Sequence, residues 1–296
     1  MPWNLEVATV KLHEQDAQPA DLANTPIVSQ AQPTTPLAVI ADFFLKTFTI
    51  AEWEIRKLRH DFSDLITRAV QPVLWLLVFG ETFTRIRAIP TGNMSYLEFM
   101  APGILSQSVL FLAIFGGIAV VWERDLGVIH KFLASPTPRG SLVLGKALSA
   151  GIRALPQALI IYMLALILGV RMNYNPLALL GVCIFAILGA ACFSTFSLII
   201  ACLLKTRDRV MGIGQVLTMP LFFASNAIYP IDIMPKPLQV IAHINPLSYV
   251  VDGIRSLMIA DAAINLNTIG LDFGILAVVT IVLVIIGSNL YPRIIQ

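Results

Sequence analysis

Charged side chains are scarce in this sequence. Only 13% of its 296 residues are Asp, Glu, Lys or Arg, whereas a soluble globular domain carries about 25%. Apolar residues make up 57% of the chain, and the mean hydropathy is +0.79. A soluble fold has too little interior for so many long apolar runs, so the sequence predicts an integral membrane protein.

Other absences exclude further classes of protein. The 20 basic and 18 acidic side chains nearly balance, and no basic block of the kind that neutralises phosphates is present, so nucleic acid is not an expected partner. The 3 cysteines form no C-x-x-C pair, which argues against a disulfide framework or a zinc knuckle. The 4 histidines lie in separate segments, and no G-x-S-x-G elbow occurs. We therefore expect no catalytic, metal or cofactor site in this chain.

The N-terminal segment, residues 1–36, differs in character from the rest. It contains no apolar core of the roughly 7–15 residues that a signal peptide needs, and it has acidic residues but no arginine, unlike a transit peptide. Its prolines and glutamines are typical of a disordered polar tail. We expect residues 37–296 to form a single transmembrane domain.

Six apolar runs predict the membrane plan of an all-α polytopic protein. A helix of about 20 apolar residues crosses a bilayer core. The predicted spans are residues 65–84, 99–122, 147–170, 177–204, 210–231 and 273–292. With both termini on the same side, one set of connecting segments carries 12 Lys or Arg and the other carries 5. The positive-inside rule then predicts that both termini are cytoplasmic, in the cell (inner) membrane.

Two segments outside the spans show amphipathic or interfacial patterns. From Ile40 to Leu65, apolar residues recur at spacings of three and four, which predicts a helix lying along the inner leaflet. A coiled-coil or soluble packing helix is the alternative. In the outer loop, residues 237–251 carry no charge and are broken at Asn245–Pro246. We expect two short re-entrant helices there, dipping into the outer leaflet.

Few polar residues interrupt the predicted spans. They are Gln71, Gln107, Gln157, Gln215 and Asn226. Interhelical hydrogen bonding is the plain interpretation of such residues. The functional alternative places Gln107, Gln215 and Asn226 along a substrate path. No ionisable group marks a span centre, which disfavours a proton-coupled pump or an ion-selective pore.

One segment resembles a phosphate-binding loop but lacks its chemistry. Residues 140–147 fit G-x-x-x-x-G-K, yet they end in Ala147, where a Ser or Thr would hold magnesium. They follow a proline-rich turn instead of a strand. We therefore expect no ATP site in this chain.

The inner loop after the second span carries the most informative pattern. Leu126, Ile129 and Leu133 recur at spacings of three and four, polar residues flank them, and Pro136 ends the pattern. This predicts a short amphipathic helix projecting between two spans. Such a helix suits insertion into a groove on a partner protein, and a plain surface helix is the alternative.

Two motifs in this order resemble a known family. The run ERDLGVIHKFLASPTPRGSLVLGK, residues 123–146, resembles the coupling-helix signature of ABC-2-type exporter membrane subunits. The run INPLSYVVDGIR, residues 244–255, is similar to the second signature of that family. The resemblance extends from about Phe43 to the C-terminus. Many members carry an acidic residue near His130 and a threonine near Val128, so this chain departs from the family pattern in the loop.

The resemblance implies a division of labour between subunits. Members of the family pair as homodimers with two separate ABC ATPase subunits, which bind ATP and Mg²⁺, so the permease chain itself is not an enzyme. The residues carried over to ATPase coupling are Glu123, Arg124, Asp125, Gly127, Phe132 and Leu133. Those carried over to the outer gate are Asn245, Pro246, Tyr249 and Arg255. A likeness to the cyanobacterial and plastid branch makes a plastid or thylakoid membrane the alternative location.

Together these observations predict the permease subunit of an ATP-driven exporter, in contact with membrane lipids. Its expected cargo is amphiphilic: a lipid-like molecule, a glycolipid or polysaccharide, or a drug. An ATP-independent secondary transporter and a membrane assembly or scaffold protein are the competing interpretations. The sequence shows no internal repeat and no buried acidic relay, which disfavours the secondary transporter.

Overall fold

The computed structural model describes most of the chain that follows the N-terminal tail. The described residues are 36–58, 67, 70–86, 89–91, 94–129, 137–204, 206–260 and 265–294. The predicted tail up to residue 35 and the predicted coupling residues Phe132 and Leu133 lie outside them. Throughout the described residues the regular structure is helical, with one isolated antiparallel bridge between Met172 and Ile259, so the all-α prediction is confirmed.

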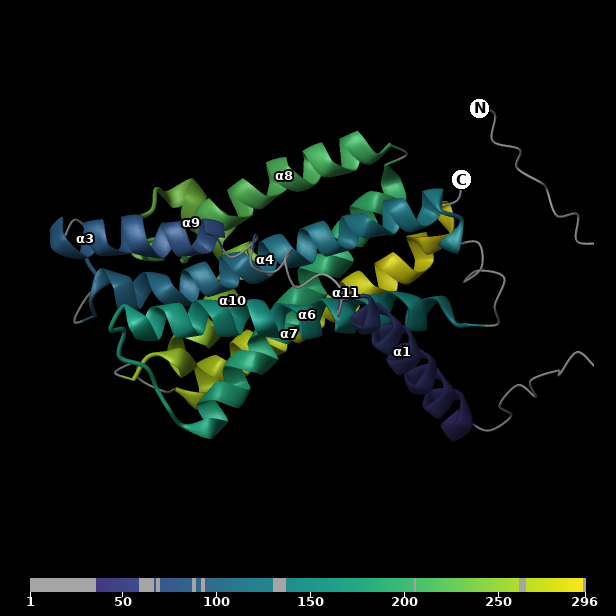
Figure 1. The fold of residues 1–296 in the computed structure, drawn as a ribbon, viewed down its shortest axis with the longest axis horizontal. Helices are drawn as coiled ribbons and strands as arrows, with labels where there is room; N and C mark the ends of the chain where they lie inside the picture. Colours follow the sequence, from purple (N-terminus) through teal and green to yellow (C-terminus); the bar gives the residue numbers. More distant parts are fainter. Residues whose placement is uncertain are drawn as a thin grey trace, which may run out of the picture.

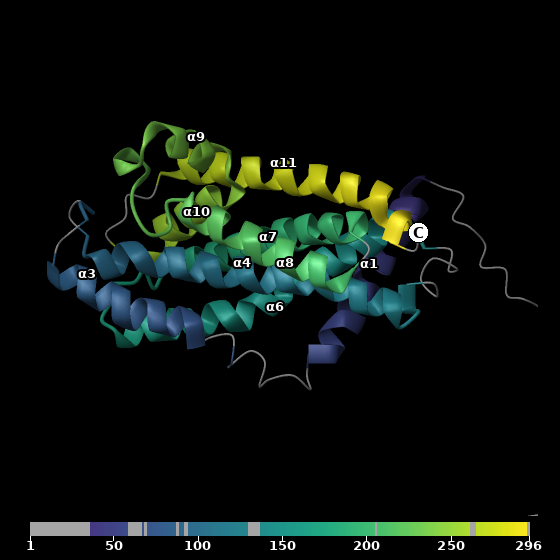
Figure 2. The ribbon, with the colours of Figure 1, turned by 90° about the horizontal axis from the view of Figure 1, so that it is seen from above.

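Four helices of the described chain are long and apolar enough to cross a membrane. They are α4 (Tyr96–Asp125), α6 (Arg139–Ile167), α7 (Pro176–Leu203) and α11 (Leu266–Leu290), which η3 (Tyr291–Ile294) continues. Helix α8 (Arg207–Phe223) has 17 residues, and the π-helical turn η1 (Trp75–Gly80) runs into α3 (Glu81–Ile86). These shorter segments pack against α4 (Figures 1 and 2). Four of the six predicted spans thus meet the length and composition of a membrane helix.

The helices run back and forth, so the bundle has two distinct ends. At one end α4 finishes while α6 and α8 begin, and the C-terminus lies there too (Figure 1). We call this the inner end, because the distribution of Lys and Arg predicts that it faces the cytoplasm. The opposite end, where α4 and α11 begin, is called the outer end.

Local polar signals determine where several helices begin. Ser95 and Glu98 form a capping box at the start of α4, with the Ser95 N–H donating to the Glu98 carboxylate at 2.8 Å. Asn175 caps α7, whose first turn contains Pro176. The preceding segment also supports this start, since the Asn175 N–H donates to the Asn173 side chain at 3.0 Å.

Helices α4 and α11 occupy opposite positions in the packing. In the most apolar 18-residue window, 78% of α4 is buried, compared with 17% of α11. The outward face of α11 consists of large apolar side chains, including Val278, Ile281 and Ile285. Exposed apolar side chains over this length fit lipid or a second protein chain and not water.

Two short helices follow α8 at the outer end, as the break at Asn245–Pro246 predicted. They are α9 (Lys236–Ile244) and α10 (Pro246–Met258). Helix α10 is buried in the bundle through Leu247, Val250 and Ile254, which are fully covered. It packs against α4, α7 and α11, so the polypeptide folds back into the protein at this end.

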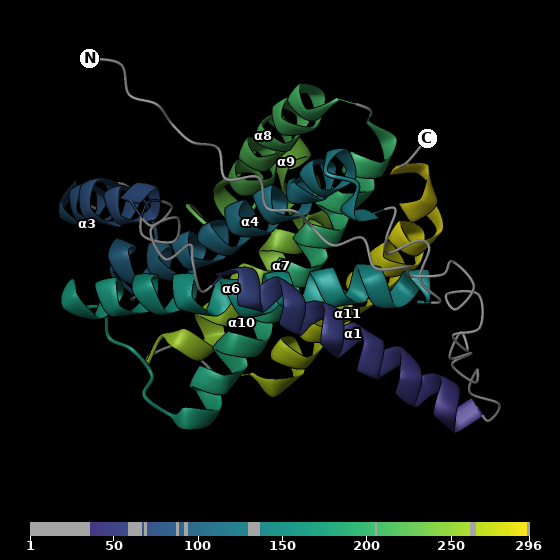
Figure 3. The same ribbon diagram turned by 45° about the vertical axis from the view of Figure 1, so that its right-hand side comes forward.

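Helix α1 (Pro36–Leu58) forms in the region of the predicted amphipathic pattern. Ile50 and Ala51 are buried, and Ile50 lies against Gly145 of α6. Phe44 and Phe48 remain exposed, at 50% and 60%. The rest of α1 projects obliquely from the bundle (Figure 3), which leaves an apolar surface along it.

Three helices have bounds that differ by more than three residues from those of the predicted spans: α6, α8, and α11, which begins at Leu266 where the predicted span begins at residue 273. Helix α6 begins at Arg139, whereas the predicted span begins at residue 147, because Lys146 is accommodated inside the helix by an acidic partner described below. The segment resembling a phosphate loop, residues 140–147, therefore lies within α6. Helix α8 ends at Phe223, although the predicted span runs to residue 231, since the chain turns there and Asn245 bonds to the Leu221 and Ala224 carbonyls.

Candidate functional site

The base of the inner loop is anchored to α6 by a buried ion pair. Glu123 of α4 accepts a hydrogen bond from the Lys146 ammonium of α6 at 2.5 Å. The two side chains are 11% and 9% exposed. A buried charge is stable only beside its counter-charge, so Glu123 and Lys146 depend on each other. The predicted coupling residue Glu123 thus faces the bundle and joins two helices.

The next acidic residue anchors the same loop to α8. Asp125 accepts hydrogen bonds from Nε of Arg207 at 2.5 Å and from Nε of Arg124 at 3.0 Å. Arg207 is the first residue of α8. The predicted coupling residues Arg124 and Asp125 therefore link the end of α4 to the start of α8 at a solvent-accessible position.

Gly127 lies in a turn directly after α4. Its φ is +71°, in the left-handed region that favours glycine, and its N–H donates to the Arg124 carbonyl at 2.9 Å. An added Cβ would meet nothing within 4 Å, so only the backbone conformation requires glycine here. Leu126 beside it is 76% exposed, while Ile129 is buried. The loop base thus consists of a fixed turn with one apolar side chain pointing outward.

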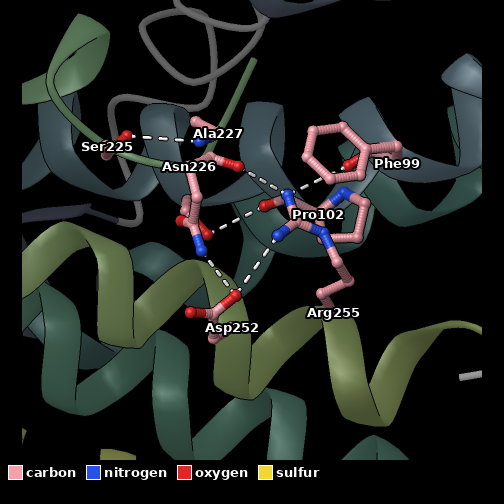
Figure 4. Close-up of polar contacts among 8 residues, drawn as sticks. Phe99, Pro102, Ser225, Asn226, Ala227, Asp252 and Arg255 are labelled. Carbon is pink, nitrogen blue, oxygen red and sulfur yellow. Dashed lines mark hydrogen bonds and ion pairs between the residues drawn. The ribbon is translucent and has the colours of Figure 1, made fainter. Parts of the chain in front are cut away.

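The outer end is closed by a buried polar network centred on Arg255 of α10 (Figure 4). Its guanidinium donates to the carbonyl oxygens of Asn226 at 2.7 Å and Phe99 at 3.2 Å, and to Asp252 at 3.2 Å. The guanidinium carbon also lies 3.9 Å from the centre of the Phe99 ring. Burial lowers the pKa of Arg255 to about 10, which leaves it charged at neutral pH.

Close packing of backbones makes this network compact. Asn226 lies in the turn after α8 and donates a hydrogen bond to the Asp252 carboxylate at 2.5 Å. That turn approaches α4 at Gly103, where an added Cβ would lie 2.1 Å from the Ala227 carbonyl oxygen. Any larger residue at position 103 would push the turn away from α4. The sequence gives no local signal for this contact.

Asn245 joins α8, α9 and α10 at one point. Its side-chain amide donates to the carbonyls of Leu221 and Ala224 at 2.7 and 2.9 Å, at the end of α8. Its side-chain oxygen accepts from the Leu247 N–H and so caps α10. One buried side chain therefore completes the ends of two helices.

The other predicted gate residues lie next to Asn245. Pro246 occupies the first turn of α10, where its missing N–H leaves no donor unpaired. The Tyr249 hydroxyl donates to the His243 carbonyl of α9 at 2.6 Å. The structure thus places Asn245, Pro246 and Tyr249 around the start of α10, whereas Arg255 lies in the last turn of that helix.

The three residues predicted to line a substrate path lie in three different places. Asn226 belongs to the outer network, and Gln215 is exposed on α8. Gln107 is buried in α4 and lines a cavity of about 140 Å³ together with Gln71 and Gln157. The interior glutamines therefore converge, but in a different combination from the predicted one.

A larger cavity lies at the outer end, beside α3. Its volume is about 770 Å³, and its wall includes Phe83, Tyr96 and the ion pair of Glu98 with Arg171. The Arg171 Nε donates to Glu98 at 2.9 Å, which ties the turn between α6 and α7 to α4. The outer end thus combines a closed network with an adjacent open hollow.

Sequence reasoning missed several partners in these clusters. Lys146 and Arg207 complete the inner anchors, and Asp252 and Phe99 complete the outer network. The spacing of Asp252 and Arg255, three residues apart on one helix, is a local signal that could have suggested a pair. The inner partners are 23 and 82 residues apart, so no local signal connects them.

Comparison with known proteins assigns the chain to a family. The profile of the family described as ABC-2 type transporter matches residues 45–259. A transport permease of Cyanophora paradoxa, ycf38, is 27% identical over 272 residues, which cover 88% of this chain and 92% of that protein.

Two bacterial relatives extend this similarity. The daunorubicin resistance ABC transporter permease protein DrrB1 of Streptomyces coeruleorubidus is 26% identical over 68% of this chain and 70% of its own length. Nodulation protein J of Rhizobium leguminosarum bv. viciae is 26% identical over 78% of this chain and 87% of its own. The relatives described as permeases are transport subunits and not enzymes. This chain therefore belongs to the ABC-2 type transporter family, as the membrane-embedded permease subunit of an ABC transporter.

Proposed function

We propose that this permease exports an amphiphilic molecule and that a separate ABC ATPase drives the export. Two copies of the chain form the pathway, and two ATPase subunits bind ATP and Mg²⁺ and hydrolyse the nucleotide. The cargo is a lipid, a glycolipid or lipid-linked polysaccharide, or a hydrophobic drug. Family membership implies the ATPase partner, and the remaining points are argued below.

The anchoring of the inner loop is the observation that carries this proposal. Glu123 ties the loop base to α6 and Asp125 ties it to α8, while the loop itself continues from α4. A push on the loop therefore acts on three helices together. At the outer end, the last turn of α8 is bonded to the side chain of Asn245. A displacement of α8 at the inner end is therefore transmitted to α9 and α10 at the outer end. This is the linkage that an ATPase needs to open an outward path.

The composition of the spans supports an amphiphilic cargo. The polar side chains in the middle of the bundle include glutamines, serines and threonines, while the buried ion pair and the network of Arg255 lie near its two ends. Hydrogen-bonding amides lower the cost of moving a polar headgroup through hydrocarbon. Apolar surfaces such as those of α11 leave room for acyl chains in the adjacent bilayer.

The arrangement of charges supports a cytoplasmic position for both termini. The C-terminus and α1 lie toward the end of the bundle that carries the inner loop (Figure 1). Positive residues at this end include Arg124, Arg139, Lys146 and Arg207. We therefore place the chain in the cell (inner) membrane, with a plastid or thylakoid membrane as the alternative location.

The transport test combines the permease with its ATPase in vesicles. The full chain is co-expressed with P-loop ATPases of the same genome, and an ATPase that co-purifies is reconstituted with it. We expect fluorescent lipids to move across the bilayer only when ATP and Mg²⁺ are present. Movement without an ATPase would favour a secondary transporter, and retention of the ATPase without any movement would favour a scaffold protein.

A pair of variants tests the predicted docking surface. Leu133→Asp places a charge on the apolar face of the inner loop, and we expect it to reduce the amount of ATPase that co-purifies. Ile233→Asp is the matched control, since Ile233 is an exposed apolar residue at the outer end, 49% exposed. Equal ATPase retention by the Leu133→Asp variant and the wild type would contradict the docking surface.

A further inference from the structure

Three glutamines from three separate helical segments meet at one cavity inside the bundle. Gln71 lies in the helical residues 70–74 that precede η1, Gln107 lies on α4, and Gln157 lies on α6. The cavity has a volume of about 140 Å³, well above the roughly 10–15 Å³ that one water molecule requires. It can therefore hold a small polar group.

The two inner glutamines have unpaired polar atoms. Gln107 is 2% exposed and Gln157 is 1% exposed. Neither Nε2 nor Oε1 of Gln107, nor Oε1 of Gln157, has a hydrogen-bond partner among the residues that the structure describes. Buried amides are normally paired, because leaving them unpaired is unfavourable. These atoms therefore point to a ligand that supplies both donors and acceptors.

The cavity lies deep in the predicted membrane region. Gln107 is eleven residues from Tyr96 and Gln157 is ten residues from Ile167, the outer ends of their helices. At 1.5 Å per residue, both side chains lie about 15–17 Å from those ends. This distance is about half of a 30 Å hydrocarbon core. A headgroup moving between leaflets would pass at this depth.

The lining favours an uncharged, hydroxyl-rich ligand. The residues around the cavity carry amide, hydroxyl and apolar groups but no charge. The rings of Phe111 and Phe115 are stacked with centroids 6.4 Å apart and form part of the wall. Amides that donate and accept, beside aromatic faces, match the hydroxyls and the C–H face of a sugar ring.

We propose that Gln71, Gln107 and Gln157 hold the uncharged glycosyl headgroup of a glycolipid during its passage. Thr67 and Gln71 on the open side are exposed, so the acyl chains remain in the bilayer while the headgroup enters. The role in passage rests on the proposed function. Binding itself requires neither ATP nor the ATPase, so it can be tested on the permease alone.

The test uses photolabelling of the full chain in lipid vesicles, without the ATPase. The probe is monoglucosyl diacylglycerol with a diazirine near the sugar, and the protein is purified without sugar-headgroup detergents, which would occupy the site. We expect unlabelled monoglucosyl diacylglycerol to compete at about a tenfold lower concentration than phosphatidylglycerol or diacylglycerol. Equal competition by all three lipids, or a preference for phosphatidylglycerol, would overturn the proposal.

Variants of the buried glutamines locate the site. Gln107→Leu and Gln157→Leu should each reduce labelling about tenfold, since each removes hydrogen bonds to the sugar. Ser106→Ala is the control on the same helix, because Ser106 bonds to the Pro102 carbonyl and lies outside the cavity lining. Replacing an unpaired amide with leucine should not lower the unfolding midpoint, so a folding defect is distinguishable. Wild-type labelling of both Leu variants would overturn the site.

The binding test and the transport test fail in different ways. Selective binding that the Leu variants lose, together with no ATP-dependent movement of the same lipid, would support the site and contradict export. ATP-dependent movement that persists unchanged in the Gln107→Leu variant would support export and contradict the site.

Discussion

The two ends of the bundle use charge in different ways. At the outer end, Arg255 is 9% exposed and bonds to groups from α4, from α10 and from the turn after α8. At the inner end, one ion pair is buried, while the pair of Asp125 and Arg207 is 32% and 45% exposed. Buried networks are rigid because every member depends on the others, whereas exposed pairs break and re-form at little cost. The outer network is therefore expected to be rigid, whereas the exposed inner pair can break and re-form.

Two glycines, one at each end of the bundle, allow the two ends to be compared directly. Gly127 at the inner end and Gly169 at the outer end both have positive φ, +71° and +81°, and both follow the end of a long helix. Neither would meet another atom if a Cβ were added. They are a matched pair, since they share a backbone requirement but differ in position relative to the predicted ATPase.

The largest effect is expected from breaking the outer network. Arg255→Ala removes three hydrogen bonds and the contact with Phe99, and it leaves a cavity where the guanidinium lay. We expect a loss of about 3–5 kcal/mol in the free energy of unfolding. Thermal unfolding of the purified protein in detergent measures it. A midpoint equal to that of the wild type would show that the outer end is not held by this residue.

Breaking the buried inner pair should cost somewhat less. Glu123→Ala leaves the Lys146 ammonium without this counter-charge in a mostly buried position, and we expect a loss of about 3 kcal/mol. The double variant Glu123→Ala, Lys146→Met should recover much of that loss, because the buried ammonium is then absent as well. A double variant less stable than the single one would argue against a pair-based anchor. The same unfolding assay reports both values.

The glycine pair separates stability from coupling. Gly127→Ala and Gly169→Ala should each reduce stability by about 1–2 kcal/mol, because alanine disfavours the left-handed conformation. We expect ATP-driven transport to fall only in Gly127→Ala, where the turn leads into the inner loop. Transport measured in vesicles at equal protein content makes the comparison. An equal loss of transport in both variants would indicate a general effect of strain.

The smallest effect on stability is expected at the exposed anchor. Asp125→Asn weakens the link to Arg207 at a solvent-accessible position, so the unfolding midpoint should not change measurably. We expect transport per ATP hydrolysed to decrease, because the loop no longer pulls on α8. Raising the salt concentration should weaken the wild-type link in the same direction. If transport per ATP hydrolysed is the same in this variant and the wild type, the bond between Asp125 and Arg207 does not contribute to coupling.

Particular residues show how far sequence reasoning reached. The break at Asn245–Pro246 indicated two short helices, which the structure confirms, because a helix start with Asn before Pro depends on neighbours two or three residues away. The helix start at Arg139 was not predicted, since charge counting treats each Lys as a boundary and cannot detect Glu123 beside Lys146. The gate residues were indicated only by resemblance, and their bonds to Phe99 and Asn226 come from distant parts of the chain.

The amino-acid sequence by itself determined the membrane class, the helical periodicity, the caps and the apolar faces of this permease, because these depend on composition and on neighbours within one or two turns. Only the tertiary structure decided which polar residues meet. It brought Gln157 beside Gln107, paired Glu123 with Lys146, and placed Arg255 over Phe99. A polar side chain in a span must find a partner, and the packing of helices far apart in the chain determines which partner it finds.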